Sequence, residues 1–342
     1  MNDEIRAFAA GGPGQRLEPF TYKPGALLPD EVEIAVEHCG ICHSDLSMLD
    51  NEWGRSVYPL VAGHEVVGRI VALGAQVKSL QEGQRVGLGW YARSCMVCTQ
   101  CLSGDYHLCH KAEATIIGRH GGFAERVRCH WAWAAPLPEA LEPAASGPLF
   151  CAGTTVFSPL TEFDVRPTDR VGVVGIGGLG HLALQFMRAW GCEVTAFTSH
   201  AGKAAEVSAF GAHHVVTSDD SVALDRLAGT FDFLLVTTNM ALDWTRFLQV
   251  LAPRGRLHFV GAVLKPLDIP AFGLIGGQKE VSGSPLGRPV TVAKMLEFAE
   301  RHAIAPQVEH FPMSRANDAL DHLRSGKARY RIVLDADFKT KG

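Results

Sequence analysis

The residues with the clearest chemistry lie between Cys39 and Glu65. This stretch contains Cys-Gly-Ile-Cys-His-Ser-Asp at positions 39–45 and Gly-His-Glu at 63–65. Cysteine, histidine and carboxylate are the ligands that Zn²⁺ prefers. The Cys-x-x-Cys is compatible with a thioredoxin-like redox pair or with half of a closed zinc site. A third interpretation is an open zinc centre, in which one cysteine, His64 and a distant residue bind the metal and leave one position for substrate.

A second cysteine cluster has the spacing C-x2-C-x2-C-x7-C. Four thiolates so close together can enclose one Zn²⁺ completely, which predicts a structural zinc lobe over residues 95–109. The alternatives are four free thiols or a zinc-ribbon reader of nucleic acid. A reader needs a basic face, whereas Arg93 and Lys111 are balanced here by Asp105 and Glu113. The predicted ligands of the structural zinc are Cys95, Cys98, Cys101 and Cys109.

A glycine-rich turn indicates a nucleotide cofactor. The segment 175–180 reads Gly-Ile-Gly-Gly-Leu-Gly and lies between a predicted buried strand at 170–175 and a predicted amphipathic helix at 179–190. In that context G-x-G-x-x-G is typical of a dinucleotide site, because glycines permit the tight turn and the approach of a pyrophosphate to the helix N-terminus. The alternative is a glycine-rich turn without a ligand. The predicted binding residues are Gly175, Gly177, Gly178, Leu179 and Gly180.

The end of the next predicted strand favours NADP(H) over NAD(H). NAD sites usually carry Asp or Glu there to bind the ribose 2′-hydroxyl. This chain has Phe-Thr-Ser-His-Ala-Gly-Lys at 197–203, without a carboxylate. We expect Thr198, Ser199 and Lys203 to bind a 2′-phosphate, which a carboxylate would repel. The alternative is that Lys203 is an ordinary solvated lysine on a helix.

Composition limits the class of protein. The chain has 342 residues, 47% of them hydrophobic, a formal net charge of −4 and nine cysteines. This charge does not indicate nucleic-acid or anionic-membrane binding. We find no signal-peptide pattern, so the cysteines are expected to be reduced thiols and metal ligands in a cytoplasmic protein.

The order of predicted elements indicates an α/β protein with an inserted domain. Residues 1–150 carry short alternating apolar runs separated by glycine and proline, typical of a β-rich domain. Residues 151–287 alternate strands and helices, which predicts a doubly wound parallel sheet of six strands. Residues 288–342 are expected to return to the first domain. Trp131 and Trp133 alternate as in a buried strand.

Taken together, these motifs resemble the zinc-containing medium-chain alcohol dehydrogenases, most closely the cinnamyl-alcohol-dehydrogenase-like branch of NADP-dependent aldehyde reductases. The resemblance implies a GroES-like catalytic domain and a Rossmann cofactor domain. It covers nearly the whole chain, and its motifs are Cys39–Asp45, Gly63–Gly68, the four-cysteine lobe, Leu149–Thr155, Val174–His181 and Tyr330–Val333.

The resemblance also implies roles for individual residues. Cys42, His64 and Cys151 would bind the catalytic zinc, and Cys39 would be a neighbour of the site only. Glu65 would lie close behind the zinc or bind it transiently. The remaining implied roles are the orientation of the histidine ligand by Asp45, a contact with the cofactor pyrophosphate by His43, and a place near the nicotinamide for Thr155.

The implied reaction is hydride transfer between an alcohol and NADP⁺, or between NADPH and an aldehyde. Ser44 resembles the hydroxyl that passes the alcohol proton outward. Five residues after the zinc cysteine, many relatives carry a histidine as the next relay member, and this chain has Ser47. The proton would therefore leave through Ser47, the nicotinamide ribose, water or another group.

The resemblance places three aromatic residues at the substrate pocket: Trp53, Trp90 and Tyr91. They favour an apolar or aromatic alcohol or aldehyde; the alternative is that they belong to a core or to a dimer surface. We expect two zinc ions per chain, NADP(H) and a homodimer. Two other functions are alternatives for this sequence. A zinc-free quinone or enone reductase would lack these cysteines, and a redox sensor would use Cys39 and Cys42 as a thiol switch.

Overall fold

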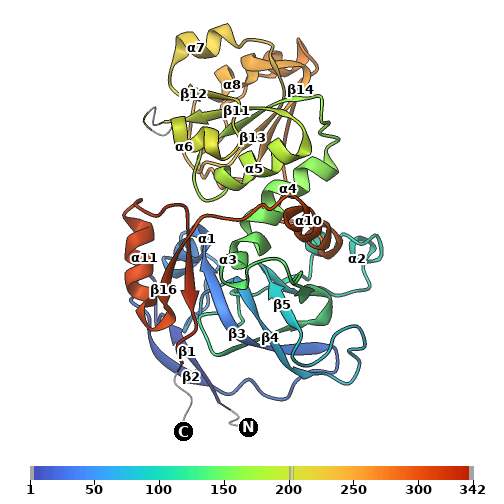
Figure 1. The fold of residues 1–342 in the computed structure, drawn as a ribbon, viewed down its shortest axis with the longest axis vertical. Helices are drawn as coiled ribbons and strands as arrows, with labels where there is room; N and C mark the ends of the chain where they lie inside the picture. The colour runs from blue at the N-terminus through green and yellow to red at the C-terminus, as the bar shows by residue number, and fades with distance from the viewer. Residues whose placement is uncertain (1–3, 200–201, 203, 339–342) are drawn as a thin grey trace. The chain divides into compact units, whose positions relative to one another are not determined.

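The computed structural model describes residues 4–199, 202 and 204–338. The chain divides into two compact units: Met1–Cys151 with Leu286–Gly342, and Ala152–Pro285. These boundaries lie within two residues of the predicted ones, and Cys151 is the last residue of the first segment. Both ends of the chain therefore contribute to the first unit, and the second is an insertion between them (Figure 1).

The first unit is built around a seven-stranded sheet with the order β16-β17-β3-β4-β5-β9, in which β8 also pairs with β3. Two-stranded ladders β1-β2 and β6-β7 lie beside it. The helices and strands of this unit are β1 Ile5–Ala9, β2 Glu18–Tyr22, β3 Glu31–Ile41, α1 His43–Leu49, β4 Glu65–Leu73, β5 Arg85–Leu88, β6 Tyr91–Arg93, α2 Thr99–Leu102, β7 Glu113–Ala114, β8 Arg126–His130, β9 Ala135–Pro136, α3 Pro143–Ser146, α10 Pro289–Arg301, β16 Val308–Pro312, α11 Ala316–Arg324 and β17 Arg331–Asp335.

The long strand β3 organises this sheet. One edge pairs with β4 along its length, while the other pairs with β8 at residues 31–35 and with β17 at 38–41. Eight of its eleven residues are buried, and its apolar residues contribute to one continuous core. The last strand of the chain, β17, is thereby held beside the end of β3 that precedes Cys42.

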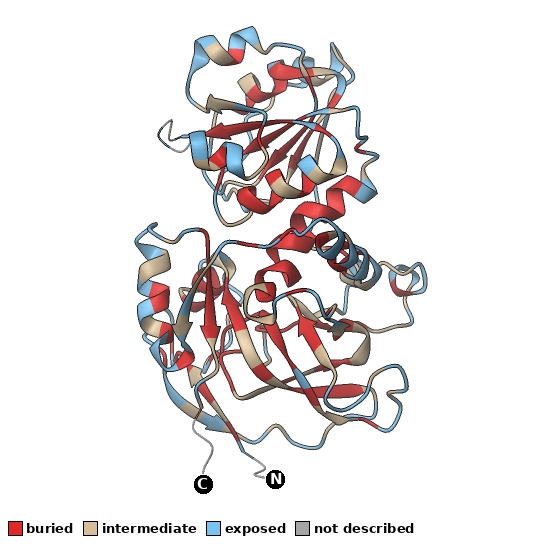
Figure 2. Ribbon diagram, in the orientation of Figure 1, coloured by how far each residue is buried: buried red, intermediate tan, exposed pale blue. Residues whose placement is uncertain are grey.

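The second unit contains six parallel strands in the order β12-β11-β10-β13-β14-β15. This is the strand order of a doubly wound dinucleotide-binding fold, and it confirms the predicted fold class. Its central strands, residues 170–174 and 231–236, are apolar and buried except at Arg170 and Asp232, and Figure 2 shows this burial. The elements are α4 Ala152–Glu162, β10 Arg170–Val174, α5 Gly180–Trp190, β11 Glu193–Thr198, α6 Ala204–Ala209, β12 His214–Thr217, α7 Ser221–Arg226, β13 Phe231–Val236, α8 Trp244–Val250, β14 Leu251–Phe259, α9 Ala271–Ile275 and β15 Glu280–Gly283.

Two details of the predicted elements were wrong. The run Phe-Ala-Glu-Arg-Val at 123–127 predicts a strand from Phe123, but the strand begins at Arg126. The backbone N–H groups of residues 121–123 donate instead to carbonyls of residues 61–63. Trp131–Trp133 form a 3₁₀ turn instead of a strand, with Trp133 buried and Trp131 half-buried. The first difference matters for the site, since residues 121–123 support the loop that carries His64.

His258 on β14 forms a buried polar contact between the last two strands of the parallel sheet. Its ring nitrogens lie 2.9 Å from the hydroxyls of Ser282 and Ser284, and the Phe163 ring lies 4.5 Å away, centroid to centroid. Burial, with a smaller contribution from Arg256, lowers the pKa of His258 to about 4. The neutral imidazole is therefore the form that fits this site.

We predict that the second unit loses stability as the pH falls from about 6.5 to about 4. The unfolded histidine binds its proton near pH 6.5 and the folded one only near pH 4, so protonation favours unfolding, by about 3 kcal/mol at the lower limit. Urea unfolding or amide exchange of β14 and β15 across this range measures the loss. His258→Gln, which cannot titrate, should flatten the dependence; an unchanged slope in that variant would contradict the assignment.

Candidate metal and nucleotide sites

Four potential metal ligands converge in the first unit. One donor atom from each of Cys42, His64, Glu65 and Cys151 can be chosen so that all four lie within 4.8 Å of one another. His64 Nε2 lies 3.3 Å from Cys151 Sγ, and the two sulfur atoms lie 4.0 Å apart. Residues separated by more than 100 positions therefore present two thiols, an imidazole and a carboxylate to one point. This set fits Zn²⁺.

The carboxylate of Asp45 explains why two of these donors are correctly placed. Asp45 accepts hydrogen bonds from the backbone N–H of Cys42, from that of Gly63 and from the ring nitrogen Nδ1 of His64, each at 2.9 Å. The first contact starts helix α1 in the manner of a capping box, with Cys42 in extended backbone conformation. The third contact leaves His64 Nε2 free to face Cys151.

The ionisation of these groups is shifted strongly. A hydrogen bond with Cys151, together with His64, lowers the pKa of Cys42 well below its ordinary value despite burial. The same contact and burial raise the pKa of Cys151. Burial lowers the pKa of His64, but the charge and hydrogen bond of Asp45 outweigh it and raise the pKa overall. The donors share protons that a bound cation would replace.

Glu65 forms a buried ion pair with Arg331 on β17 through one carboxylate oxygen, Oε1. Its second oxygen, Oε2, has no hydrogen-bond partner among the described residues and is buried. Burial raises the pKa of Glu65, opposed by the Arg331 charge. An orphaned carboxylate oxygen beside two thiols and an imidazole fits a cation at this point. A side chain at Gly40 would overlap Oε2, so this position requires glycine.

Sequence reasoning missed Arg331 as a site residue, although Arg331 lies within the family motif Tyr330–Val333. The available signal was an arginine at the start of the apolar strand Arg-Ile-Val-Leu, a position where a buried charge needs a partner.

Cys39 does not belong to the group of potential ligands. It lies at the end of β3, fully buried, and its Sγ is 3.6 Å from the carbonyl oxygen of Gly40. Burial raises its pKa well above the ordinary value. A buried thiol of raised pKa is a poor nucleophile, so no observation favours a Cys39/Cys42 thiol switch.

Two serines follow Cys42 on α1. Ser44 Oγ lies 3.6 Å from Cys42 Sγ. Ser47 is buried, and its hydroxyl donates to Glu52 Oε2 at 2.7 Å, while Glu52 itself is exposed. Ser47, the residue found where many relatives carry histidine, is therefore connected to a solvent-exposed carboxylate. Sequence reasoning did not single out Glu52.

Of the three aromatic residues predicted for the pocket, two lie together beside the metal group. The Trp90 ring meets the His64 ring edge-on at 5.0 Å, and Trp53 meets Trp90 at 6.0 Å. Tyr91 instead packs on Trp133, at 5.2 Å between centroids. Trp53 and Trp90 are half-buried and can present ring surface near His64.

The second cysteine group also converges. Sulfur atoms of the four residues all lie within 4.8 Å of one another, with Cys95 3.9 Å from Cys101 and Cys98 3.8 Å from Cys109. Backbone N–H groups near Val97 lower the pKa of Cys95 to about 6, and burial raises that of Cys101 to about 12. Four thiols at these separations fit a Zn²⁺ bound by four sulfur ligands.

The glycine-rich turn joins β10 to α5 in the second unit. Gly175 has φ of +94°, and a Cβ at Gly180 would overlap the Gly175 carbonyl, so both positions require glycine. At Gly177, by contrast, nothing among the described residues lies within 4 Å of where a Cβ would stand. Open space at the N-terminus of an eleven-residue helix fits an approaching pyrophosphate.

The other predicted cofactor residues that the structure describes lie in different elements and differ in burial. Thr198 ends β11 and is buried, Ser199 beside it is exposed, and Lys203 lies outside the described residues. Thr155 is buried in α4 and His43 is exposed at the start of α1. Their roles at the cofactor stay predictions.

Comparison with known proteins identifies the family. Residues 28–139 match the alcohol dehydrogenase GroES-like domain, and residues 178–301 match the zinc-binding dehydrogenase domain. The chain is 54% identical to aldehyde reductase AdhA of Synechocystis over 96% of this chain and 98% of that protein. It is 36% identical to probable cinnamyl alcohol dehydrogenase 6 of Arabidopsis thaliana, over 97% and 94%.

Solved structures agree. The cinnamyl alcohol dehydrogenase SbCAD4 of Sorghum bicolor superposes with a TM-score of 0.94 at 32% identity, covering 99% of this chain and all of that one. The Helicobacter pylori CAD complexed with NADP(H) superposes with a TM-score of 0.90 at 28% identity, covering 98% and 99%. The chain belongs to the zinc-containing alcohol dehydrogenases, on the branch of the cinnamyl alcohol dehydrogenases. It is an oxidoreductase.

Metal quantification separates the two sites. We predict about two zinc ions per chain, one from each ligand group. Cys151→Ser should reduce the content to about one and leave the lobe filled, while Cys98→Ser should empty the lobe. Cys192→Ser is the matched control, because this buried cysteine contacts the Arg166 carbonyl instead of a metal group. A content near one in the unmodified protein would contradict the open site.

Proposed function

We propose that this protein transfers hydride between NADP(H) and a primary alcohol or aldehyde with an apolar or aromatic side group. The observation that carries the proposal is the convergence of Cys42, His64 and Cys151, with Glu65 Oε2 unpaired behind them. The similarity to an aldehyde reductase, to cinnamyl alcohol dehydrogenases and to a structure complexed with NADP(H) supports the same reaction.

In this proposal Cys42, His64 and Cys151 hold the catalytic zinc. When bound, zinc supplies a Lewis acid that polarises the substrate oxygen. The protein orients this set through Asp45, which holds His64 and the start of α1. Arg331 holds Glu65 by one oxygen and leaves the other free as a transient ligand.

The proton of the alcohol leaves along α1. Ser44 and Ser47 lie one helical turn apart, a spacing that places side chains on the same face. Ser44 accepts the hydroxyl proton as it passes its own outward. Ser47 continues the relay, and Glu52 Oε2 accepts the proton at the surface. In aldehyde reduction the same groups deliver the proton in reverse, so Ser47 and Glu52 replace the histidine of many relatives.

The phosphate and substrate contacts complete the proposed site. Gly175–Gly180 and the start of α5 bind the pyrophosphate. For His43 and Thr155 the roles at the cofactor are those that the resemblance implies. Thr198, Ser199 and Lys203 bind the 2′-phosphate. Trp53 and Trp90 form the wall on which an apolar or aromatic side group packs.

We infer that the assembly is a homodimer. The helix α9 has no buried residue, and Phe272 and Ile275 on it are 87% and 68% exposed. It precedes β15, the open edge of the parallel sheet. An apolar helix beside an unpaired edge is suited to a second copy. Light scattering tests this: a mass near that of one chain, 36.9 kDa, would contradict it.

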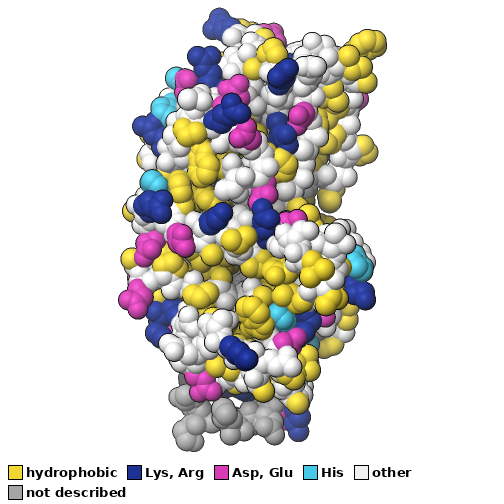
Figure 3. Space-filling model, turned by 90° about the vertical axis from the view of Figure 1, so that its right-hand side faces the viewer, with side chains coloured by type: hydrophobic (Ala, Val, Ile, Leu, Met, Phe, Trp, Pro, Cys, Tyr) yellow, Lys and Arg dark blue, Asp and Glu magenta, His cyan; other side chains and the backbone are white. Residues whose placement is uncertain are grey.

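On the face in Figure 3, basic and acidic side chains are interspersed. Within the described residues, no helix has both the length and the hydropathy to span a membrane. The expectation of a cytoplasmic protein stays a prediction.

An aldehyde and alcohol panel with both cofactors tests the proposed function. Cys42→Ser should abolish NADPH oxidation by aldehydes, and undiminished turnover would eliminate the assigned centre. Lys203→Ala should raise the KM for NADPH about tenfold, since a charge-assisted contact is worth about 1.5–3 kcal/mol. The KM for NADH should change little; equal effects on both cofactors would count against a 2′-phosphate site.

The relay has a separate test. Glu52→Gln keeps a hydrogen-bond acceptor for Ser47 but cannot take up a proton, so alcohol oxidation should slow about tenfold. A small diffusible base such as formate should restore part of the rate, and the KM for NADP⁺ should not change. Asp50→Asn is the control, because this neighbouring carboxylate is paired with Arg324. Equal rates and pH profiles in Glu52→Gln and the unmodified protein would remove Glu52 from the relay.

A further inference from the structure

The backbone of Trp90 is hydrogen-bonded to Thr115, at the far end of the chain segment that contains the four-cysteine lobe. The Trp90 carbonyl accepts a hydrogen bond from the backbone N–H of Thr115 at 2.7 Å, and the Gly89 carbonyl accepts one from the Thr115 hydroxyl at 2.6 Å. Thr115 is 1% exposed. A Cβ at Gly89 would overlap the Phe150 carbonyl, so this backbone also lies tightly against the residue before Cys151.

Trp90 and Thr115 lie at the two ends of the segment 90–115, whose ends are joined by a pair of strands. Strand β6 begins directly after Trp90, strand β7 ends directly before Thr115, and the two strands pair with each other. All four lobe cysteines lie in the chain between them. Ser94, buried after β6, donates to the Tyr106 carbonyl inside the lobe at 2.9 Å. The lobe and the indole beside His64 therefore share a short two-stranded stem.

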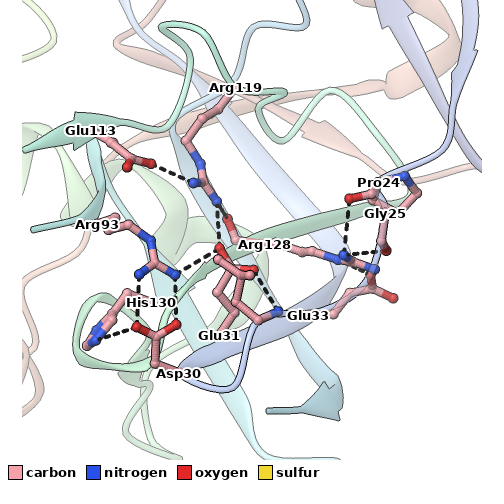
Figure 4. A network of polar contacts seen from close by, with 11 residues as sticks. Pro24, Gly25, Asp30, Glu31, Glu33, Arg93, Glu113, Arg119, Arg128 and His130 are labelled. Carbon is pink, nitrogen blue, oxygen red and sulfur yellow. Dashed lines mark hydrogen bonds and ion pairs between the residues drawn. The ribbon is translucent and has the colours of Figure 1, made fainter.

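An ion cluster fastens this stem to the main sheet, as Figure 4 shows. From β6, Arg93 donates to both oxygens of Asp30 at 2.8 and 2.9 Å and lies 3.2 Å from Glu31. Arg119 bridges Glu31 at 3.3 Å and Glu113 on β7 at 2.7 Å. Both stem strands are thus tied, through two arginines, to the start of β3.

The inner members of the cluster, Glu31 and Arg93, are shielded from solvent, whereas Asp30 and Glu113 are 31% and 44% exposed. The Glu31 side chain is 6% exposed and that of Arg93 is 18% exposed. The hydrogen bonds from Arg93 lower the pKa of Asp30 below its usual range, and the acidic partners raise the pKa of Arg93. Bidentate arginine–carboxylate pairs restrict orientation as well as distance, which a lysine cannot reproduce.

We propose that the lobe stem and its ion cluster determine substrate specificity by positioning Trp90. The position of Trp90 sets how strongly the site beside His64 favours ring-bearing substrates over small ones. This inference rests on the proposed function, because it uses Trp90 as the wall of the substrate site. Arg93 and Thr115 act as positioning residues and do not contact substrate. The lobe thus has a role in selectivity in addition to its role in stability.

The test uses conservative variants of the intact chain. Arg93→Lys keeps the charge but removes the bidentate contact, and Thr115→Val removes one hydroxyl at nearly constant shape. Arg128→Lys is the matched control. Arg128 belongs to the same cluster region and is similarly shielded, 16% exposed, but pairs with Glu33 and not with the stem. Trp90→Ala supplies the reference for complete loss of the wall.

The first readout is the ratio of kcat/KM for benzaldehyde to that for propanal. Trp90→Ala should lower this ratio about tenfold, and Arg93→Lys and Thr115→Val about threefold, since aromatic contacts and single positioning groups are worth about 0.5–1.5 kcal/mol. In the Trp90→Ala background, Arg93→Lys should have no further effect on the ratio. An additive effect there, or an equal effect of Arg128→Lys, would overturn the proposal.

The second readout does not depend on turnover. In protein labelled with 5-fluorotryptophan, the ¹⁹F resonance lost in Trp90→Phe identifies Trp90. This resonance should shift or broaden in Arg93→Lys and Thr115→Val, but not in Arg128→Lys, with the zinc content unchanged. An unmoved resonance would overturn the inference and leave the proposed function intact. Absence of turnover with every aldehyde would instead contradict the proposed function, and the resonance would still decide whether the stem positions Trp90.

Discussion

The metal group depends on one buried carboxylate. Asp45 is completely buried, and a carboxylate in such surroundings is stable only when hydrogen bonds or charges compensate for its lost hydration. Three N–H groups from Cys42, Gly63 and His64 supply that compensation. Cys42 and His64 lie about twenty residues apart in the sequence. The hydrogen bonds that both make to Asp45 therefore also fix the distance between these two metal donors.

The fourth donor is held by a contact across the sheet. Arg331 arrives on the last strand, β17, which pairs with the end of β3 that leads into Cys42. Breaking a buried ion pair by removing one partner typically costs about 3–5 kcal/mol, because the other charge is left without compensation. The site therefore uses residues from both segments of the first unit, Met1–Cys151 and Leu286–Gly342. Gly40 contributes by leaving room for Glu65.

The two cysteine groups are connected through the protein scaffold. Trp90 touches the ring of one metal ligand, and the strand that follows Trp90 leads into the lobe. The lobe over residues 95–109 has little hydrophobic core of its own. A metal ion bound by its four cysteines would restrict the motion of this backbone. In the proposed function, that arrangement gives the substrate site a rigid wall at Trp90.

Much of the architecture could be predicted from the sequence because its signals are local. Alternation, helical periodicity and glycine at special turns indicated most strands and helices, the parallel sheet and the nucleotide turn at Gly175–Gly180. Short cysteine spacing indicated the lobe. Where local signals were ambiguous, the prediction was wrong: Trp131–Trp133 alternate like a strand but form a 3₁₀ turn.

The amino-acid sequence by itself determined the elements, the family and the candidate ligands. Only the tertiary structure decided that Ser47 is bonded to Glu52 and that Arg331 pairs with Glu65. The physical reason is that residue types and spacing report interactions within a few residues. Which distant side chains share a buried volume depends on strand register and on the exclusion of water, and both are fixed only when the chain packs.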